Sequence, residues 1–270
     1  MTRTLVQGIL NVTPDSFSDG GQWINPRDAI AHGMQLIADG ADLIDVGGES
    51  TRPGAQRTSQ TEELQRVLPV VTELSKHVQV SVDTMRAEVA KAAIDAGATI
   101  INDVSGGLSD PQMLGVVASN GVDFICQHWR GYGDVMNAAA KYHDVVGETA
   151  QELKNRVSAC LAAGIESEKI IIDPGLGFAK VGDDDWQILA NLETFTTMGY
   201  RVLIGASRKR FLAAVTGARP AQDRDGATAA VSTICALAQV WAVRTHEVRL
   251  QRDCVAVAEK LLKIRGANYE

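Results

Sequence analysis

The sequence lacks the features that would place the protein in a membrane or outside the cell. Its most apolar stretch, from Val231 to Val243, is interrupted by polar residues and is too short to cross a bilayer. The first residues run directly into a strand pattern, without the apolar stretch of a signal peptide. The four cysteines contain no C-x-x-C pair, which favours reduced and buried thiols. We therefore expect a cytoplasmic protein without a membrane partner.

Positive charge is also scarce. The chain has 26 lysines and arginines against 33 aspartates and glutamates, which gives a formal net charge of −7 at pH 7. Nucleic-acid binding needs a basic face that neutralises phosphates, so we expect no nucleic-acid partner. No Gly-x-Gly-x-x-Gly fingerprint follows the first apolar run, which argues against a doubly wound dinucleotide-binding sheet. The sequence also shows no obvious Ser/His/Asp or Cys/His arrangement.

Short runs rich in Val, Ile and Leu alternate with longer amphipathic stretches along the whole chain. Continuous apolar runs are typical of parallel strands that are covered on both faces. Strand–helix units of this size in 270 residues predict an α/β fold, a (β/α)8 TIM barrel that forms a single domain over residues 1–270. The expected strands are Leu5–Asn11, Leu43–Val46, Val80–Asp83, Thr99–Asn102, Asp123–Gln127, Ile170–Asp173, Val202–Gly205 and Trp241–Arg244.

Local signals mark the ends of several helices. Asn25-Pro26 offers an N-cap followed by a proline at the first helical position, and Ser59 to Glu62 has the spacing of a capping box. Asp110-Pro111 is expected to open another helix. Glycines that suit a left-handed helix end precede the strands at Gly40, Gly97, Gly121, Gly164 and Gly199.

Nearly every expected strand ends in polar residues. Because parallel strands of one barrel share their carboxyl ends, these residues predict an active site at one mouth. In chain order they are Asn11, Glu49, Asp83, Asn102, Gln127 with His128, Asp173, Ser207 to Lys209, and Arg244 with His246.

The polar residues divide by charge. Asp83, Asn102 and Asp173 offer two carboxylates and an amide, a set that suits a flat heterocycle, and Lys209 adds a donor. The cations near strands two, seven and eight suit phosphate, with Asn11 as a neutral oxygen ligand for Mg²⁺. These cations are Arg52, Arg208, Lys209, Arg210, Arg244 and His246, of which Arg210 is expected at the surface.

Two long motifs of the chain resemble those of a known enzyme family. Residues 8–21, which read Gly-Ile-Leu-Asn-Val-Thr-Pro-Asp-Ser-Phe-Ser-Asp-Gly-Gly, resemble the opening motif of the dihydropteroate synthase family. The run Asp-Val-Gly-Gly-Glu-Ser-Thr-Arg-Pro-Gly at 45–54 resembles its second motif. Shorter matches follow in order at 81–84, 101–103, 173–178, 205–209 and 244–246.

The resemblance implies the reaction and its residues. The family joins 6-hydroxymethyl-7,8-dihydropterin diphosphate to 4-aminobenzoate, giving 7,8-dihydropteroate and diphosphate in folate biosynthesis; Mg²⁺ and a homodimer are expected with it, as is inhibition by sulfonamides. Carried over by motif, the pterin residues are Asp83, Asn102, Asp173 and Lys209, and the diphosphate residues are Asn11 with Mg²⁺, Arg244 and His246. The aminobenzoate residues are Phe17, Thr51, Arg52, Pro53, Phe178 and Ser207, with Asp19 on a closing loop; Gly205 and Gln127 complete the substrate-binding set.

The chain departs from the family pattern at two places. Gln127 stands before His128 where the family usually has methionine, and Glu247 replaces an aspartate in the last motif. Three alternatives remain: a catalytically silent pterin-binding paralogue, a barrel that transfers methyl groups from methyltetrahydrofolate to a corrinoid, and a zinc hydrolase. The methyltransferase has no need of Arg244 and His246, and Cys126-x-His128 with His246 is a weak zinc set.

Overall fold

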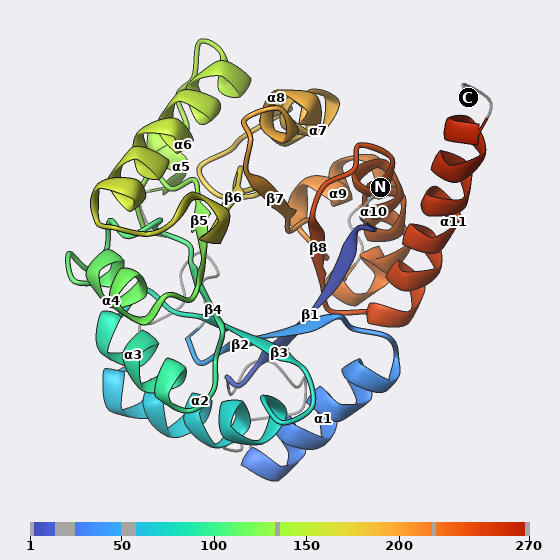
Figure 1. Cartoon of the computed structure of the whole chain (residues 1–270). Coiled ribbons are helices and arrows are strands. Elements are labelled where there is room, and N and C mark those ends of the chain that lie inside the picture. Colours follow the sequence, from blue (N-terminus) through green and yellow to red (C-terminus); the bar gives the residue numbers. More distant parts are fainter. Residues whose placement is uncertain (1–2, 14–24, 50–57, 133–135, 218–219, 268–270) are drawn as a thin grey trace.

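Eight parallel strands close into one barrel in the computed structural model of the chain, which describes residues 3–13, 25–49, 58–132, 136–217 and 220–267. Each strand pairs with its neighbours in chain order, and β8 pairs with β1 to complete the ring (Figure 1). The strands are β1 (Leu5–Asn11), β2 (Leu43–Gly47), β3 (Gln79–Asp83), β4 (Ile100–Asp103), β5 (Asp123–Gln127), β6 (Ile170–Asp173), β7 (Arg201–Ile204) and β8 (Ala242–Thr245). The predicted TIM barrel is confirmed, and every predicted strand agrees with its observed bounds to within one residue.

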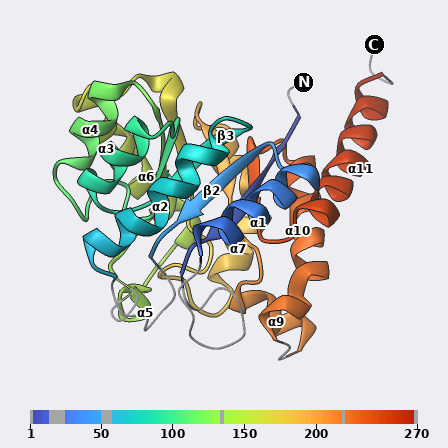
Figure 2. The same cartoon turned by 90° about the horizontal axis from the view of Figure 1, so that it is seen from below.

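Helices surround the barrel and cover its outer face (Figure 1). Figure 2 shows α1 and α2 packed over β2 and β3, so these strands are buried on both sides. The helices are α1 (Pro26–Ala38), α2 (Gln60–Leu74), α3 (Ala87–Asp95), α4 (Met113–Asn120), α5 (Met136–Ala139), α6 (Val145–Ala162), α7 (Asp184–Ala190), α8 (Leu192–Thr196), α9 (Arg210–Thr216), α10 (Asp225–Leu237) and α11 (Val248–Ala267). Two 3₁₀ turns, η1 (Ser167–Lys169) and η2 (Ala221–Arg224), precede β6 and α10.

The predicted helix signals have mostly the expected roles. Asn25 caps α1 by accepting a hydrogen bond from the Arg27 amide, and Ser59 with Glu62 forms the capping box of α2. Asp110 does not begin a helix: α4 starts at Met113, and the Asp110 carboxylate accepts from the Ala87 and Gln112 amides instead. All five glycines named at helix ends have positive φ, as a left-handed helix end requires.

The apolar core has two parts on either side of the barrel wall. The larger part fills the space between strands and helices. The smaller part fills the interior of the barrel toward the amino-terminal ends of the strands. The interior part consists of Leu43, Ile100, Ile125, Ile171, Leu203 and Ala242, all fully buried. Strand side chains alternate between faces, so the residue two positions further along each strand also points into the barrel, nearer its carboxyl mouth.

The structure also bears on the expectations about the cysteines and about membrane-spanning segments. Cys126, Cys160 and Cys235 are buried free thiols as predicted, whereas Cys254 is only partly buried. Within the described parts of the chain, no helix is both long and apolar enough to span a membrane.

Candidate active site

A spacing of two residues leads from the apolar interior to the mouth of the barrel. Moving two positions from the six interior residues reaches Asp45, Asn102, Gln127, Asp173, Gly205 and Arg244. Strand register then places Asp83 beside Asn102, and Gln127 beside Asp173. The predicted strand-end residues therefore meet above one apolar floor, at the end of the barrel where TIM-barrel enzymes carry their active sites.

Arg244 lies among carboxylates at this mouth. Its Nε donates to Asp45 Oδ2 at 2.6 Å, and its Nη2 donates to Asp83 Oδ2 at 2.9 Å. The amide of Asn102 donates to the same Asp45 oxygen at 3.0 Å. The acidic and basic residues that the sequence analysis assigned to two separate sides are thus in direct contact.

Lys209 and Asp173 form a second group around Gly205. Gly205 lies between them: a Cβ there would be at van der Waals distance, 3.9 Å, from both Asp173 Oδ2 and Lys209 Nζ. Asp173 Oδ1 accepts a hydrogen bond from the Gly175 amide at 2.7 Å. Lys209 Nζ donates to the Leu176 carbonyl and lies 4.6 Å from the centre of the Phe178 ring. The structure therefore brings Phe178 and Gly205 to the same corner as the two charged residues.

Burial shifts the ionisation of this cluster. Desolvation and the nearby Asp45 raise the pKa of Asp83 to about 7, although Arg244 opposes the shift. Desolvation also lowers the pKa of Lys209 to about 8, against the opposite effect of Asp173, and burial raises the pKa of Asp173. Perturbed groups of opposite sign in one concave site are typical of an active site.

These values predict a narrow, bell-shaped pH profile of kcat/KM for the pterin substrate. The roles that the resemblance implies require an ionised Asp83, so activity should rise as the pH passes about 7, and a protonated Lys209, so activity should fall above about 8. Lys209→Arg should extend the alkaline limb, because arginine keeps its proton beyond about pH 12. Steady-state rates between about pH 5.5 and about pH 9.5 test this. A wild-type profile that is flat across that range contradicts it.

Ser207 and His246 meet on the other side of the mouth. Ser207 Oγ lies 2.9 Å from His246 Nδ1, and it also accepts a hydrogen bond from the His246 amide at 3.1 Å. The contact with Nδ1 restrains the orientation of the imidazole ring, and the contact with the amide holds the backbone of His246 in place. The pair follows β7 and β8, where barrels often bind phosphate.

The remaining predicted cations are not all at the mouth. Arg208 makes a bidentate ion pair with Asp225 of α10, at 2.7 and 2.8 Å, and has a positive φ of 60°. It therefore braces the end of β7 against α10, and its assignment to the phosphate side finds no support. Arg210 begins α9 and is exposed, as expected. Phe17, Asp19, Thr51, Arg52 and Pro53 lie outside the described residues.

Gln127 is buried at the floor with an incomplete set of hydrogen bonds. Its side chain is 5% exposed, and its Nε2 has no partner among the residues that the structure describes. Its neighbour His128 turns away to Glu152, whose oxygen lies 2.9 Å from Nε2 of the ring, and burial lowers the pKa of His128 to about 4. Gln127 thus places a polar amide at a buried position where the family usually has an apolar methionine side chain.

We expect Gln127→Met to stabilise the free enzyme. A buried polar group without a partner costs about 1–3 kcal/mol, and methionine fills a similar volume without this penalty. The midpoint of urea unfolding should rise by an amount equivalent to about 1 kcal/mol. Gln79→Met, on the exposed start of β3, is the matched control and should shift the midpoint little. An unchanged or lower midpoint for Gln127→Met would show that the amide is satisfied.

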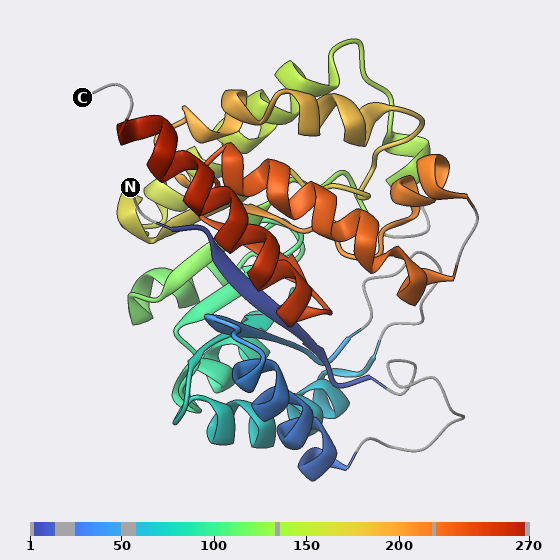
Figure 3. The same ribbon diagram turned by 90° about the vertical axis from the view of Figure 1, so that its right-hand side faces the viewer.

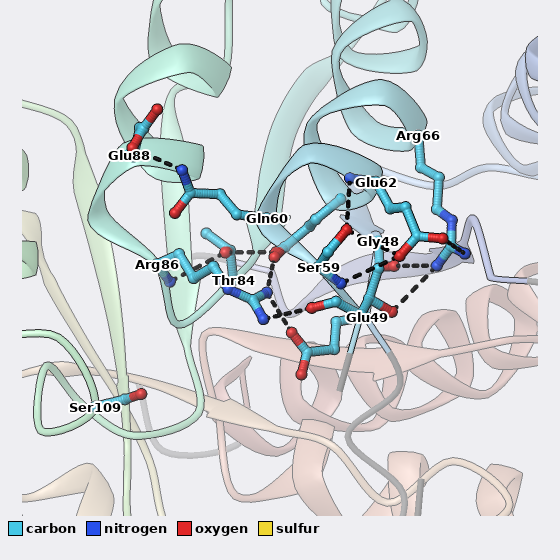
Figure 4. A network of polar contacts seen from close by, with 12 residues as sticks. Gly48, Glu49, Ser59, Gln60, Glu62, Arg66, Thr84, Arg86, Glu88 and Ser109 are labelled. Carbon is cyan, nitrogen blue, oxygen red and sulfur yellow. Dashed lines mark hydrogen bonds and ion pairs between the residues drawn. The ribbon is translucent and has the colours of Figure 1, made fainter. Parts of the chain in front are cut away.

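Sequence reasoning missed two charged residues. Asp45 is fully buried in the middle of β2, where an apolar residue was assumed. Arg86 pairs with Glu49 and with the buried Glu63, and its Nη2 donates to the Thr58 carbonyl at 2.6 Å (Figure 4). Glu49 is therefore committed to an ion pair that ties the chain after β2 to the chain after β3. The two-residue spacing from Leu43 is the signal that could have revealed Asp45.

No group of three or more His, Cys, Asp or Glu side chains within the described ranges is arranged to hold a metal ion. Asn11 instead offers a single amide oxygen, which faces Gly47: a Cβ on this glycine would lie 3.5 Å from Asn11 Oδ1 and 3.9 Å from Asp83 Oδ2. One or two protein oxygens plus substrate phosphates and water are typical of Mg²⁺. The donor set is compatible with Mg²⁺ that arrives with a phosphorylated substrate.

The fold and the mouth define a class: a TIM-barrel enzyme with a buried, strongly charged site. Residues 7–246 match the family model described as pterin binding enzyme. The chain is 48% identical to dihydropteroate synthase of Mycobacterium leprae, over 93% of this chain and 91% of the relative.

Solved structures agree with this match. Xanthomonas albilineans dihydropteroate synthase with 4-aminobenzoic acid is 40% identical and superposes with a TM-score of 0.90, covering 96% of this chain and 93% of that one. Yersinia pestis dihydropteroate synthase in a sulfonamide drug complex is 36% identical with a TM-score of 0.92, covering 97% and 95%. The chain belongs to the dihydropteroate synthase family of pterin-binding enzymes, which are transferases.

Proposed function

We propose that the protein condenses 6-hydroxymethyl-7,8-dihydropterin diphosphate with 4-aminobenzoate to form 7,8-dihydropteroate and diphosphate, and that residues 1–270 act as one catalytic domain. The observation that carries this proposal is the convergence of Asp83, Asp173, Lys209 and Arg244 above one apolar floor. Such a site offers a flat ring both acceptors and a donor, with a cation beside it.

The pterin ring is held by the acidic group. Asp83 and Asp173 accept from ring N–H groups, Asn102 offers both a donor and an acceptor, and Lys209 donates to a ring oxygen or nitrogen. Gly205 lies next to both Asp173 and Lys209 and has no side chain that would stand between them and the ring. Lys209 exchanges its contact with the Leu176 carbonyl for the ring when the pterin binds.

The diphosphate is held by Arg244 and His246, with Asn11 as the protein ligand of Mg²⁺. When bound, Mg²⁺ neutralises charge on the leaving diphosphate and so makes it a better leaving group. Arg244 lies beside Asp83, so its guanidinium belongs to the same group of residues as the carboxylate assigned to the ring. The contact of Ser207 Oγ with Nδ1 keeps the His246 imidazole in position.

The chemical step follows from these charges. As diphosphate leaves, positive charge develops at the exocyclic methylene and spreads into the pterin ring. The Asp83 and Asp173 carboxylates stabilise that charge electrostatically. The neutral amine of 4-aminobenzoate then attacks the methylene carbon, and its proton passes to solvent, so no general base is needed for the first step. Phe178 and Ser207 border the entry side, where Phe17, Asp19, Thr51, Arg52 and Pro53 are assigned by resemblance alone.

The proposed reaction is ordered: the diphosphate group binds first and 4-aminobenzoate binds second, and a calorimetric experiment tests this order. A synthase should bind 4-aminobenzoate only when diphosphate or the pterin diphosphate is present, because the leaving group completes the site. A silent pterin-binding paralogue should bind pterin alone and release no diphosphate, and a methyltransferase should bind methyltetrahydrofolate. Equal affinity for 4-aminobenzoate with and without diphosphate contradicts the ordered scheme.

An apolar stripe on α11 supports a homodimer. Leu250, Val257, Leu261 and Ile264 follow helical spacing on one face and are between 38% and 59% exposed. The neighbouring α10, which lies alongside α11 in Figure 3, exposes Ile234 at 48%. Light scattering should give twice the chain mass for the wild type and a smaller mass for Val257→Asp/Leu261→Asp. A monomeric wild type contradicts the homodimer.

The cytoplasmic location stays a prediction.

A further inference from the structure

Asp45 lies in the candidate active site, and the family resemblance assigns no role to it. It lies in the middle of β2, two residues beyond the interior residue Leu43, and its side chain is fully buried. A single oxygen, Oδ2, accepts from both Arg244 Nε at 2.6 Å and Asn102 Nδ2 at 3.0 Å. Asp45 therefore joins a residue assigned to the diphosphate with one assigned to the pterin ring.

The two ends of the Arg244 guanidinium have different partners. Nε is held by Asp45, which is inaccessible to solvent, and Nη2 is held by Asp83, which borders the open mouth. A guanidinium has five N–H donors in a rigid plane, so one side can stay bound while the other side changes partner. Arg244 is thus attached at an inner point and at an outer point.

The outer contact competes with the substrate. Asp83 is assigned to the ring N–H groups of the pterin, and the same Oδ2 now accepts from Arg244. Ring N–H groups that donate to this carboxylate share its charge with Arg244, which weakens the contact and leaves Nη2 able to turn to a new anion. Without the contact to Asp45, the guanidinium of Arg244 would either stay bound to Asp83 or turn away from the site once its contact with Asp83 is lost.

We propose that Asp45 is a positioning residue: it holds Arg244 by Nε while Nη2 exchanges Asp83 for the diphosphate of the substrate. This inference rests on the proposed function, and Asp45 itself touches neither substrate. A charge-assisted hydrogen bond is about twice as strong as a neutral one, so the Asp45 charge is what makes the anchor effective. The negative charge of Asp45 also raises the pKa of Asp83, so that Asp83 stays protonated up to a higher pH.

The first test is Asp45→Asn, which keeps the shape and removes the charge. We expect KM for the pterin diphosphate to rise about tenfold, equivalent to about 1.4 kcal/mol, while KM for 4-aminobenzoate at saturating pterin changes by less than about twofold. The acid limb of the kcat/KM profile should move to lower pH, because a negative neighbour of Asp83 has gone. A purely structural role would lower the melting temperature and move neither of these quantities.

A double-mutant cycle shows whether Asp45 acts through Arg244. In an Arg244→Met background, Asp45→Asn should have no further effect on the affinity for pterin diphosphate, measured by calorimetry without 4-aminobenzoate. Additive effects would overturn the proposal, as would an unchanged KM in the single variant. Asp123→Asn is the matched control: it weakens a partly buried pair with Arg201 (2.8 Å), at the opposite end of the barrel, and should leave all kinetic constants unchanged.

A measurement on the wild-type protein avoids any folding defect of the variants. With inorganic diphosphate as the probe, the Nε–H of Arg244 should stay protected from solvent exchange in NMR spectra, while the resonances of its Nη groups shift. Loss of Nε protection on binding would overturn the proposal. A wild type that makes no dihydropteroate would instead refute the proposed function, so the two failures are distinguishable.

Discussion

Arg244→Met should lower kcat/KM by about a thousandfold and should also destabilise the fold. The side chain donates to both Asp45 and Asp83, and those carboxylates raise the pKa of Arg244 despite its burial. Removing one partner from a buried ion pair costs about 3–5 kcal/mol, because the remaining charge stays desolvated. Removing a cation from a leaving group costs about 4 kcal/mol of transition-state stabilisation, which corresponds to about a thousandfold in rate. Diphosphate release and urea unfolding measure the two effects separately.

A matched arginine distinguishes the two causes. Arg201 is also partly buried and pairs with Asp123 at 2.8 Å, at the amino-terminal end of the strands. Arg201→Met should lower the stability and leave kcat/KM unchanged within about twofold. If Arg244→Met loses less than about tenfold in kcat/KM, its position beside Asp83 is not used in the reaction.

Asp83→Asn should lower kcat/KM by about a hundredfold or more and should not lower the stability at pH 8. The charge that stabilises the developing cation is lost, while the side-chain shape is kept. Because the pKa of Asp83 is raised in the folded protein to about 7, the ionised form opposes folding. Asp83 supports the fold fully only below its unfolded pKa of about 4, and this contribution is lost as the pH rises to about 7. The melting temperature of Asp83→Asn at pH 8 should therefore equal or exceed that of the wild type.

The control for Asp83→Asn is a carboxylate that is equally buried but points away from the mouth. Asp103 at the end of β4 is fully buried and accepts hydrogen bonds from the Ser105 amide and hydroxyl and from the Gly107 amide. Asp103→Asn should leave kcat/KM unchanged. Because burial also raises the pKa of Asp103 to about 6, its ionised form likewise opposes folding, so the stability of Asp103→Asn at pH 8 should change in the same direction as that of Asp83→Asn. A stability loss at pH 8 for Asp83→Asn, with rates like the wild type, would make Asp83 a structural residue.

The strands were the easiest feature to predict, because an apolar run that is buried on both faces differs sharply from an amphipathic helix. The mouth was also predictable, since parallel strands of one barrel must place their polar ends together. Pairings between distant residues were not. Arg208 suited phosphate by its motif, yet it pairs with Asp225 on α10, and no local pattern encodes that contact.

Asp45 illustrates the same limit from the other direction. A carboxylate in mid-strand conflicts with the expectation of an apolar interior, and only its contacts with Arg244 and Asn102 explain it. The opening of α4 was misplaced for a related reason: Asp110 serves the amide of Ala87, at the start of another helix. Long-range partners decide the role of a polar residue, and one sequence does not reveal them.

The central claim is that the buried acidic and basic residues act together on one substrate at one mouth. The most direct test measures diphosphate and dihydropteroate from the pterin diphosphate, with and without 4-aminobenzoate, for the wild type, Asp83→Asn and Arg244→Met. The claim predicts equal amounts of both products in the wild type only when 4-aminobenzoate is present, and a large loss of both in each variant. Equal turnover in all three proteins, or diphosphate release that never yields dihydropteroate, would contradict it.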